Sequence, residues 1–212
     1  MKNLVIIGAG AMGRETFWYV RDAMPDMNVK GFLDSRSGLL DGFDGYPPIL
    51  DSVDAYDIEE GDVFVPAIGD PVAKLRYSDM IRDRGGEFVS VVHPSAYVAP
   101  TARVGIGSII APHAVLAADA VVDECVILNV NASVSHDCAI GRGTSVSPGC
   151  SIAGRCKIHD MAFIGTGASI LPDVELGGEG LVYVGAGAVV TRSFGRGLVA
   201  GVPAEFKREV RV

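Results

Sequence analysis

The chain has 212 residues, of which 49% are hydrophobic and 21% are charged, and its formal net charge is −8. This length and composition are typical of an ordinary globular protein with one or two domains. No apolar run approaches the roughly 20 residues of a membrane span, and the negative charge argues against a nucleic-acid partner, which would favour a basic surface.

The start of the chain and its cysteines indicate the compartment. The apolar run from Leu4 to Ile7 is followed at once by glycines and charged residues, which is unlike a secretory signal. The cysteines form no CxxC pair, so we interpret them as reduced structural thiols rather than as disulfides or a metal site. We therefore expect a cytoplasmic protein without membrane insertion and without a metal. The four cysteines are Cys125, Cys138, Cys150 and Cys156.

A glycine-rich segment follows the first predicted strand. Residues 2–7 read as a buried parallel strand, residues 8–13 have the spacing G-x-G-x-x-G, and residues 14–23 have helical apolar spacing. A second strand over residues 29–33 ends at Asp34. This pattern is typical of a nucleotide-binding turn, in which the glycines let the backbone approach phosphates and an acid reaches a ribose hydroxyl.

The rest of this first region is short. It offers a strand over residues 63–68, a helix over residues 72–84 and a strand over residues 88–92. That is half of a doubly wound fold, which suits one nucleotide better than a dinucleotide. We therefore predict a site for a mononucleotide or a nucleotide sugar. A redox cofactor, or glycines that only make a tight turn, are the alternatives.

A period of six residues begins at Val92. Stepping by six from this residue reaches branched aliphatic side chains as far as Leu176, and short side chains stand four places after them. The frame slips once, by two residues, between Gly177 and Tyr183, and resumes at Val184. Apolar side chains on one face recur about every 3.6 residues in a helix and about every 2 residues in a strand. A period of six therefore indicates another geometry.

Hexapeptide periodicity is typical of a parallel β-helix, in which each unit supplies one short strand and one turn. Three units complete a triangular coil of about 18 residues, so residues that far apart become neighbours at roughly 4.8 Å. We predict a Rossmann-like α/β half domain over residues 1–91, a parallel β-helix over residues 92–200 and a C-terminal tail over residues 201–212. The segment His93-Pro94-Ser95-Ala96 joins the first two parts.

The coil over residues 129–141 carries the most suggestive polar side chains. His136 lies two places after the interior Val134, so its ring projects outward, and Asp137 follows directly. A carboxylate beside an imidazole holds one tautomer and raises the proton affinity, as a general base requires. One coil further on, Gly154 leaves its backbone N–H open to a developing oxyanion.

Several other polar groups read as structural. We expect His93 to be a joint residue, and His113 and His159 to face solvent without a role. Solvent exposure without a role is also the alternative for His136. Cys138 and Cys150 point inward in the hexapeptide frame, which argues against a covalent cysteine intermediate.

Motifs along almost the whole chain resemble the hexapeptide-repeat sugar acetyltransferases of the sialic acid O-acetyltransferase type. Their relatives N-acetylate nucleotide-linked 4-amino sugars such as bacillosamine and perosamine precursors. The matching segments are residues 4–15, Gly31-Phe32-Leu33-Asp34, Ala67-Ile68-Gly69-Asp70, residues 93–96, residues 129–138, Ala153-Gly154 and Gly201-Val202-Pro203-Ala204.

The resemblance implies a left-handed β-helix, a homotrimer with active sites between neighbouring β-helices, and acetyl-CoA as the acyl donor lying along the groove. It implies that His136 is the general base, that Asp137 orients it and that Asn129 lies beside the acceptor. The Gly154 N–H would bind the thioester carbonyl. The coenzyme groove would be lined by Ser145, Gly154, Thr166, Gly185, Ala186, Gly187, Gly201 and Pro203. The nucleotide of the acceptor would lie against Gly10, Ala11, Met12, Gly13, Asp34, Ser35 and Gly69.

Two departures bear on the acceptor. The amino-sugar N-acetyltransferases carry histidines where this chain has Met12 and Ser145. We therefore expect acetyl transfer to a sugar, with nitrogen and oxygen acceptors both open. The alternative functions are a trimeric ligand-binding scaffold without catalysis and an NAD(P)-linked oxidoreductase.

Overall fold

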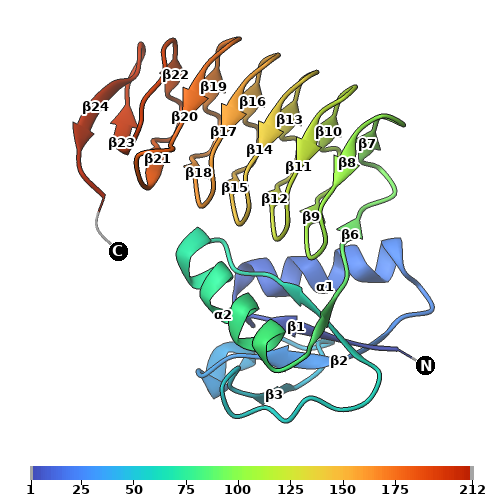
Figure 1. Ribbon diagram of the computed structural model, residues 1–212. Helices are drawn as coiled ribbons and strands as arrows, with labels where there is room; N and C mark the ends of the chain where they lie inside the picture. The colour runs from blue at the N-terminus through green and yellow to red at the C-terminus, as the bar shows by residue number, and fades with distance from the viewer. Residues whose placement is uncertain (1, 211–212) are drawn as a thin grey trace.

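The computed structural model describes residues 2–210, so Met1 and the end of the predicted tail, Arg211 and Val212, lie outside the described residues. The first part of the chain is a parallel sheet with the strand order β3-β2-β1-β4-β5 (Figure 1). This order is that of the first five strands of a doubly wound fold, although β3 and β5 are only three and two residues long. The strands are β1 (Asn3–Ile7), β2 (Asn28–Leu33), β3 (Ile49–Asp51), β4 (Asp62–Pro66) and β5 (Glu87–Phe88).

The helices α1 (Ala11–Ala23) and α2 (Pro71–Asp83) pack on this sheet, and a short 3-10 turn, η1 (Ser37–Leu40), follows β2. Side chains of a strand alternate between the faces of a sheet. Leu4 and Ile6 accordingly pack in one cluster with α1, whereas Val5 and Ile7 pack in another with α2. α1 begins at Ala11 rather than at the predicted Arg14, so the end of the glycine-rich segment forms its first turn.

The second part is a β-helix that, within residues 2–210, has three parallel sheets and takes one short strand from each sheet per coil (Figure 1). The domain-facing sheet lies against the first part. Its strands are β6 (Val91–Val92), β9 (Ile109–Ile110), β12 (Ile127–Leu128), β15 (Ser145–Val146), β18 (Phe163–Ile164), β21 (Val182–Val184) and β23 (Gly197–Ala200), and β24 (Glu205–Arg208) pairs antiparallel with β23.

We name the other sheets by their outward side chains. The uncharged sheet presents Tyr, Val and Ser residues to solvent, whereas the third sheet presents Arg103, Lys157 and Glu175 among others. The uncharged sheet consists of β7 (Tyr97–Val98), β10 (Val115–Leu116), β13 (Ser133–Val134), β16 (Ser151–Ile152), β19 (Ser169–Ile170) and β22 (Val189–Val190). The third sheet consists of β8 (Arg103–Val104), β11 (Val121–Val122), β14 (Ala139–Ile140), β17 (Lys157–Ile158) and β20 (Glu175–Leu176).

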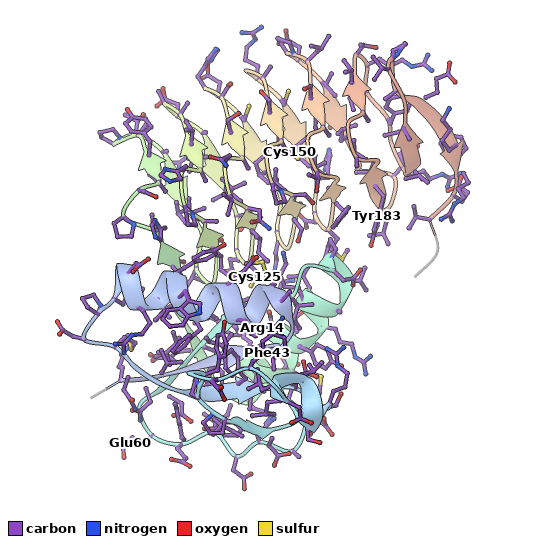
Figure 2. All side chains as sticks on the ribbon, turned by 180° about the vertical axis from the view of Figure 1, so that it is seen from behind. Arg14, Phe43, Glu60, Cys125, Cys150 and Tyr183 are labelled. Atoms are coloured by element: carbon purple, nitrogen blue, oxygen red, sulfur yellow. The ribbon has the colours of Figure 1, made fainter. Side chains whose placement is uncertain are left out.

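The register confirms the predicted period. Val134 pairs with Ile152 in the next coil, and the two-residue slip appears where Ile164 pairs with Val184. The aliphatic frame residues fill the inside of the prism together with short corner side chains such as Cys150, which Figure 2 shows among the central coils. Burial of this apolar column, rather than any single contact, holds the coils together.

Two corners of the prism position the site. The base edge joins the uncharged sheet to the third sheet and comprises residues 117–120, 135–138, 153–156 and 171–174. The groove edge joins the domain-facing sheet to the uncharged sheet and comprises residues 111–114, 129–132, 147–150, 165–168 and 185–188. Corner residues such as Asn131 (φ 56°) and Asp137 (φ 58°) have a left-handed backbone.

The first part is fixed to the domain-facing sheet by apolar and polar contacts. Val91, Ile109 and Ile127 share a buried cluster with residues of α1. Lys74 of α2 is fully buried, and its ammonium donates to Ser145 Oγ at 2.7 Å and to the Thr144 carbonyl oxygen at 3.3 Å. Burial lowers the pKa of Lys74 to about 7, because removing a cation from water disfavours its charged form.

The structure corrects the sequence-based elements in two further places. The predicted strand over residues 88–92 is divided: β5 ends at Phe88 in the first sheet, and β6 begins at Val91 in the β-helix. Strand β3 was not predicted, because its three residues follow a loop rich in Gly, Asp and Pro and carry no alternation. Among residues 2–210, no helix has the length and apolar character needed to cross a membrane.

Candidate active site

A histidine and an aspartate form a dyad on the base edge. His136 Nδ1 lies 2.7 Å from Asp137 Oδ2, and both side chains are about half exposed. A carboxylate at this nitrogen fixes the tautomer that leaves Nε2 free to accept a proton. Within residues 2–210, Nε2 has no hydrogen-bond partner, so the dyad can act as a base on a molecule that reaches this edge.

Gly154 lies directly against the imidazole of His136, as the predicted stacking requires. A Cβ atom on Gly154 would stand 2.7 Å from both Cε1 and Nε2 of His136, far inside contact distance. The neighbouring coils are joined here by the Arg155 N–H, which donates to the His136 carbonyl oxygen at 3.0 Å. Glycine is therefore the residue that lets the ring and the next coil approach this closely.

Gly154 is buried beside the His136 ring, but its backbone N–H is unpaired among residues 2–210. Its carbonyl accepts from the Asp173 N–H at 3.1 Å, whereas its own N–H has no acceptor within the described residues. The corner is braced by Arg155, whose Nε and Nη2 lie 2.7 and 2.8 Å from the Asp173 carboxylate. Arg155 holds the pKa of Asp173 below its usual value. An unpaired N–H on a braced corner beside Nε2 can stabilise an oxyanion that is brought against it.

Most of the residues expected along the coenzyme groove stack on the groove edge. The Gly187 N–H donates to the Thr166 carbonyl oxygen at 2.8 Å, and the Val189 N–H donates to the Gly201 carbonyl oxygen at 3.0 Å. These contacts place Thr166, the Gly185–Gly187 corner and Gly201 on successive coils, with Pro203 in the same last turn. Ser145 is elsewhere, buried beneath α2 against Lys74.

A cavity opens at the carboxyl ends of β1, β2 and β4. It has a volume of about 310 Å³, which is within the usual range for small-molecule sites. The residues expected to hold the nucleotide line it, apart from Gly13: they are Gly10, Ala11, Met12, Asp34, Ser35 and Gly69. The N-terminus of α1, which has no side-chain cap, forms one wall and provides free N–H groups for an anion.

Gly13 and Asp34 have structural contacts in this cavity region. A Cβ atom on Gly13 would stand 2.0 Å from the Gly8 carbonyl oxygen, so this glycine allows α1 to approach β1. Asp34 Oδ2 accepts from the Ala9 N–H at 3.1 Å, and Arg36 forms an ion pair with the carboxylate at 3.0 Å. Burial alone would raise the pKa of Asp34, but these hydrogen bonds hold it below its usual value.

Arg36 and Tyr77 also line the cavity and were not predicted. Arg36 follows Asp34 by two residues, and this acid-x-base spacing could have indicated from the sequence that the two side chains pair. Tyr77 stands one helical turn beyond Ala73, which lines the same cavity. Nothing in the sequence shows which face of α2 lies toward the glycine-rich segment. The position of Tyr77 in the cavity wall could therefore not be predicted.

Asn129 links the cavity to the β-helix. Its amide nitrogen lies 3.9 Å from the Met12 sulfur, and its Oδ1 accepts from the Val130 N–H at 2.7 Å. Met12 lines the cavity and Asn129 lies on the groove edge. The structure therefore brings the cavity to the groove edge, while His136 lies on the base edge, on the other side of the uncharged sheet.

The remaining histidines lie apart from these groups. His93 lies between α1 and the first coil, with Nε2 3.1 Å from Asp22 Oδ2. His159 Nε2 lies 2.6 Å from Glu175 Oε1, and the loop at Gly177 and Gly178 covers its ring. His113 is exposed on the groove edge. The sulfurs of Cys138 and Cys150 are buried inside the prism, where a bound thioester cannot reach them.

Comparison with known proteins agrees with this arrangement. Residues 3–81 match the family model described as the PglD N-terminal domain. PerB from Caulobacter crescentus, solved with CoA and GDP-perosamine, is 30% identical, with 98% of each chain covered and a TM-score of 0.87. The acetyltransferase domain of PglB from Neisseria gonorrhoeae is 29% identical, covering 98% of this chain and 100% of that one, with a TM-score of 0.88.

A third solved structure, WeeI from Acinetobacter baumannii, is 26% identical, covering 97% of this chain and 99% of that one, with a TM-score of 0.86. These likenesses extend over both parts of the chain, so they concern the nucleotide-binding turn and the β-helix together. The chain therefore belongs to the family of hexapeptide-repeat sugar acetyltransferases, enzymes that transfer an acetyl group from acetyl-CoA to a sugar.

Proposed function

We propose that this protein acetylates a nucleotide-linked sugar by direct transfer from acetyl-CoA, with His136 as the general base. The observation that carries this proposal is the position of the free His136 Nε2 against Gly154, whose backbone N–H is unpaired among the described residues. A proton acceptor and an oxyanion donor on neighbouring coils are what attack on a thioester needs.

The proposed step uses groups of this chain without a covalent enzyme intermediate. His136 Nε2 takes the proton from the sugar amine or hydroxyl as that atom bonds to the thioester carbon. The Gly154 N–H stabilises the negative charge that develops on the carbonyl oxygen. The carbon–sulfur bond then breaks, and the imidazolium returns the proton to the leaving thiolate, so that CoA is released as a thiol. Asp137 stabilises the imidazolium between these proton transfers.

The cavity beside α1 supports a nucleotide-linked acceptor. Free N–H groups at the N-terminus of α1 suit a diphosphate, and apolar residues such as Val53 and Ile68 also line the cavity, where a base can pack against them. The structure of PerB contains GDP-perosamine as well as CoA, which supports the same class of acceptor here. The four free thiols fit a reducing compartment, and we place the protein in the cytoplasm.

One copy of the chain keeps the acceptor cavity and the base apart. Asn129 and His136 lie on opposite edges of the uncharged sheet, and a strand of that sheet with its turns spans roughly 17 Å. The outward residues of this sheet carry no charge and only short or apolar side chains, apart from Tyr97. They are Tyr97, Val115, Ser133, Ser151, Ser169 and Val189. Such a face suits burial against another copy.

A homotrimer through the uncharged sheet would complete the site. In a cyclic assembly around an axis parallel to the β-helix, the base edge of one copy meets the groove edge of the next. Six residues of a coil rise by only about 1.6 Å, so a base-edge residue meets the residue six places earlier. His136 would thus meet Val130 and its neighbour Asn129, beside the mouth of the cavity.

The same offset supports the coenzyme position. Gly154 on the base edge would meet Pro148 on the groove edge of the next copy, and the column through Thr166 and the Gly185–Gly187 corner continues from there toward the C-terminus. This column carries small residues and no charged side chain. An extended thioester chain fits along such a channel, with its carbonyl at Gly154.

The function is tested by mixing the protein with acetyl-CoA and a panel of sugars, each offered free and as its nucleoside diphosphate derivative, and measuring thiol release. We expect release only with nucleotide-linked sugars, and we expect the His136→Ala variant to release thiol roughly 10²- to 10⁴-fold more slowly than the wild type. Equal rates with the free sugars would contradict the nucleotide-linked acceptor, and equal rates with the variant would contradict the base.

The assembly is tested with Ser151→Glu, which places a charge in the middle of the uncharged sheet. Burying an unpaired carboxylate is costly, so we expect light scattering to show monomers and thiol release to cease, while circular dichroism is unchanged. The matched control is Lys157→Glu, which changes charge at the corresponding outward position of the third sheet. A trimeric, active Ser151→Glu variant would exclude this interface.

A further inference from the structure

The aspartate that orients His136 has an unused oxygen. Asp137 Oδ2 is 2.7 Å from His136 Nδ1, whereas Oδ1 has no partner within residues 2–210. A carboxylate with one free oxygen on an exposed corner can rotate away from the ring. A second donor at Oδ1 would hold it in the plane that His136 needs.

The groove edge of the same coil carries a matching group. Asn131 is exposed, and neither its amide nitrogen nor its amide oxygen has a partner among the described residues. Its backbone φ of 56° is nearly that of Asp137, 58°, so the two side chains leave equivalent positions of their corners. They are also six residues apart, the offset at which the two edges meet between copies.

We propose that Asn131 is a positioning residue for the catalytic dyad of the neighbouring copy, with its amide N–H donating to the free oxygen of Asp137. This proposal rests on the assembly described under the proposed function. Within one chain the two residues lie on opposite edges, roughly 17 Å apart, so the contact exists only between copies. A short polar amide at this corner fits a carboxylate better than any apolar side chain.

The coil below supports the pairing of the two edges. There the same corner positions carry His113 (φ 58°) and Asp119 (φ 60°), whose ring and carboxylate have no partner within residues 2–210. An imidazole on the groove edge and a carboxylate on the base edge are complementary groups. Two successive coils therefore offer a donor on one edge and a carboxylate on the other.

Other charged groups near the dyad belong to its own copy. Arg155 lies one coil above Asp137, but its guanidinium is held by Asp173. Asp119 lies one coil below, and the Cys138 thiol is directed inward to the Ala153 carbonyl oxygen. None of these groups donates a hydrogen bond to the free oxygen of Asp137, which leaves this oxygen available to a donor from a neighbouring copy.

The test replaces Asn131 with aspartate, which removes the donor and adds a negative charge next to the dyad. The proton affinity of His136, followed by NMR of its ring protons, should rise by roughly three- to tenfold. The acid limb of kcat/KM should move to higher pH, with KM for acetyl-CoA unchanged. Asn28→Asp, the same chemical change on the exposed surface of the first part, should leave both unchanged.

A mixed assembly separates an effect between copies from one within a chain. In trimers of wild type with the double variant Asn131→Asp/His136→Ala, every His136 signal comes from a wild-type copy. A raised proton affinity for part of this signal supports the proposal, and an unchanged signal overturns it. The NMR readout does not require turnover, so a failure to find any sugar substrate would contradict the proposed function and leave this result intact.

Discussion

The base edge and the groove edge run along the same β-helix, but they differ in chemistry. Each corner of the base edge carries one ionisable residue with a left-handed backbone: Asp119, Asp137, Arg155 and Asp173. The groove edge carries Gly149, Gly167 and Gly187 at the same positions above Asn131. Acids, a base and an open amide therefore lie along one edge, and small residues that leave room for a ligand lie along the other.

This difference teaches that neither edge is a complete site. The base edge carries the His136–Asp137 dyad, whereas the cavity beside α1 adjoins the groove edge, whose histidine among the described residues, His113, has no carboxylate partner. Substitutions on one edge should therefore change the chemical step, and substitutions on the other should change binding.

The largest effect is expected at His136. Replacing it with alanine removes the proton acceptor from the base edge and should lower kcat by roughly 10²- to 10⁴-fold. Acetyl-CoA binding, measured by calorimetry, should be retained because the groove edge is untouched. A variant that turns over as fast as the wild type would show that the chemistry lies elsewhere.

Gly154→Ala should be the next most harmful change on the base edge. Its Cβ would stand 2.7 Å from the imidazole and push the ring away from the reacting carbonyl. We expect kcat to fall by roughly 10²-fold, the cost of a misplaced oxyanion donor and base. Steady-state kinetics check this, with Gly38→Ala as the control outside both edges, because a Cβ on Gly38 would meet only the exposed Asp41 side chain.

Lys74 joins α2 to the domain-facing sheet and lies on neither edge. Substituting it should therefore change the stability of the fold without changing the chemical step. In the folded state burial lowers its pKa to about 7, well below the unfolded value of about 10.5. The unfolded state thus binds more protons between these values, so the free energy of unfolding should rise with pH across that window. Below about pH 7 the folded state should carry the full cost of the buried cation.

Lys74→Met removes that buried cation. We expect urea unfolding at pH 7 to show a gain of roughly 1–4 kcal/mol, and the gain should shrink at pH 9. Activity of the folded protein should be retained. A less stable variant, or an unchanged slope of stability with pH, would mean that Lys74 is not a strained cation in the folded state.

On the groove edge, Thr166→Trp should impair binding. An indole on this corner fills the channel proposed for acetyl-CoA, so KM for acetyl-CoA should rise by roughly tenfold or more, the cost of a lost contact and a steric clash. Binding of a nucleoside diphosphate in the distant cavity should be unchanged. Calorimetry with each ligand distinguishes the two sites, and equal losses for both would indicate general misfolding.

The smallest effect is expected at His159, which resembles His136 but lies on neither edge. Its Nε2 is occupied by Glu175 and its ring is covered by the Gly177 loop. His159→Ala should leave kcat/KM within about twofold of the wild type. A large loss would mean that a histidine–carboxylate pair works without the open amide found at Gly154.

The repeat made most of the β-helix predictable. The period starting at Val92 gave the stacking of Gly154 on His136, because residues about 18 apart must be neighbours. The period also located the slip after Gly177. Local signals were enough here, since each strand pairs with the nearest coils and no distant contact decides the register.

Contacts between the two parts of the chain were not predictable. Ser145 was expected to line the coenzyme groove, but α2 covers it, and Lys74 of this helix donates a hydrogen bond to its hydroxyl. The contact between Met12 and Asn129 likewise depends on how the first part sits on the domain-facing sheet. Figure 2 shows Tyr183 near the N-terminus of α2, where its hydroxyl donates to Asp70 at 3.3 Å. Such contacts are set by tertiary packing, which leaves no periodic signal.

The cavity residues were partly predictable. The G-x-G-x-x-G spacing identified the wall formed by Ala11 and Met12, because the turn from strand to helix is local. Asp34 was expected to be free for a ribose, but Arg36 holds its carboxylate. A basic side chain two residues away can form an ion pair with a carboxylate that was expected to bind substrate. The spacing in the sequence does not show in which direction that basic side chain points.

The claim that both edges come from different copies is tested most directly by co-expressing His136→Ala with Thr166→Trp. Each pure variant lacks one edge in every site, whereas a mixed trimer contains sites with an intact base edge and an intact groove edge. At low acetyl-CoA, we expect the mixture to recover about a quarter of the wild-type rate, the fraction given by random assembly. A rate no higher than the sum of the two variants would contradict a site shared between copies.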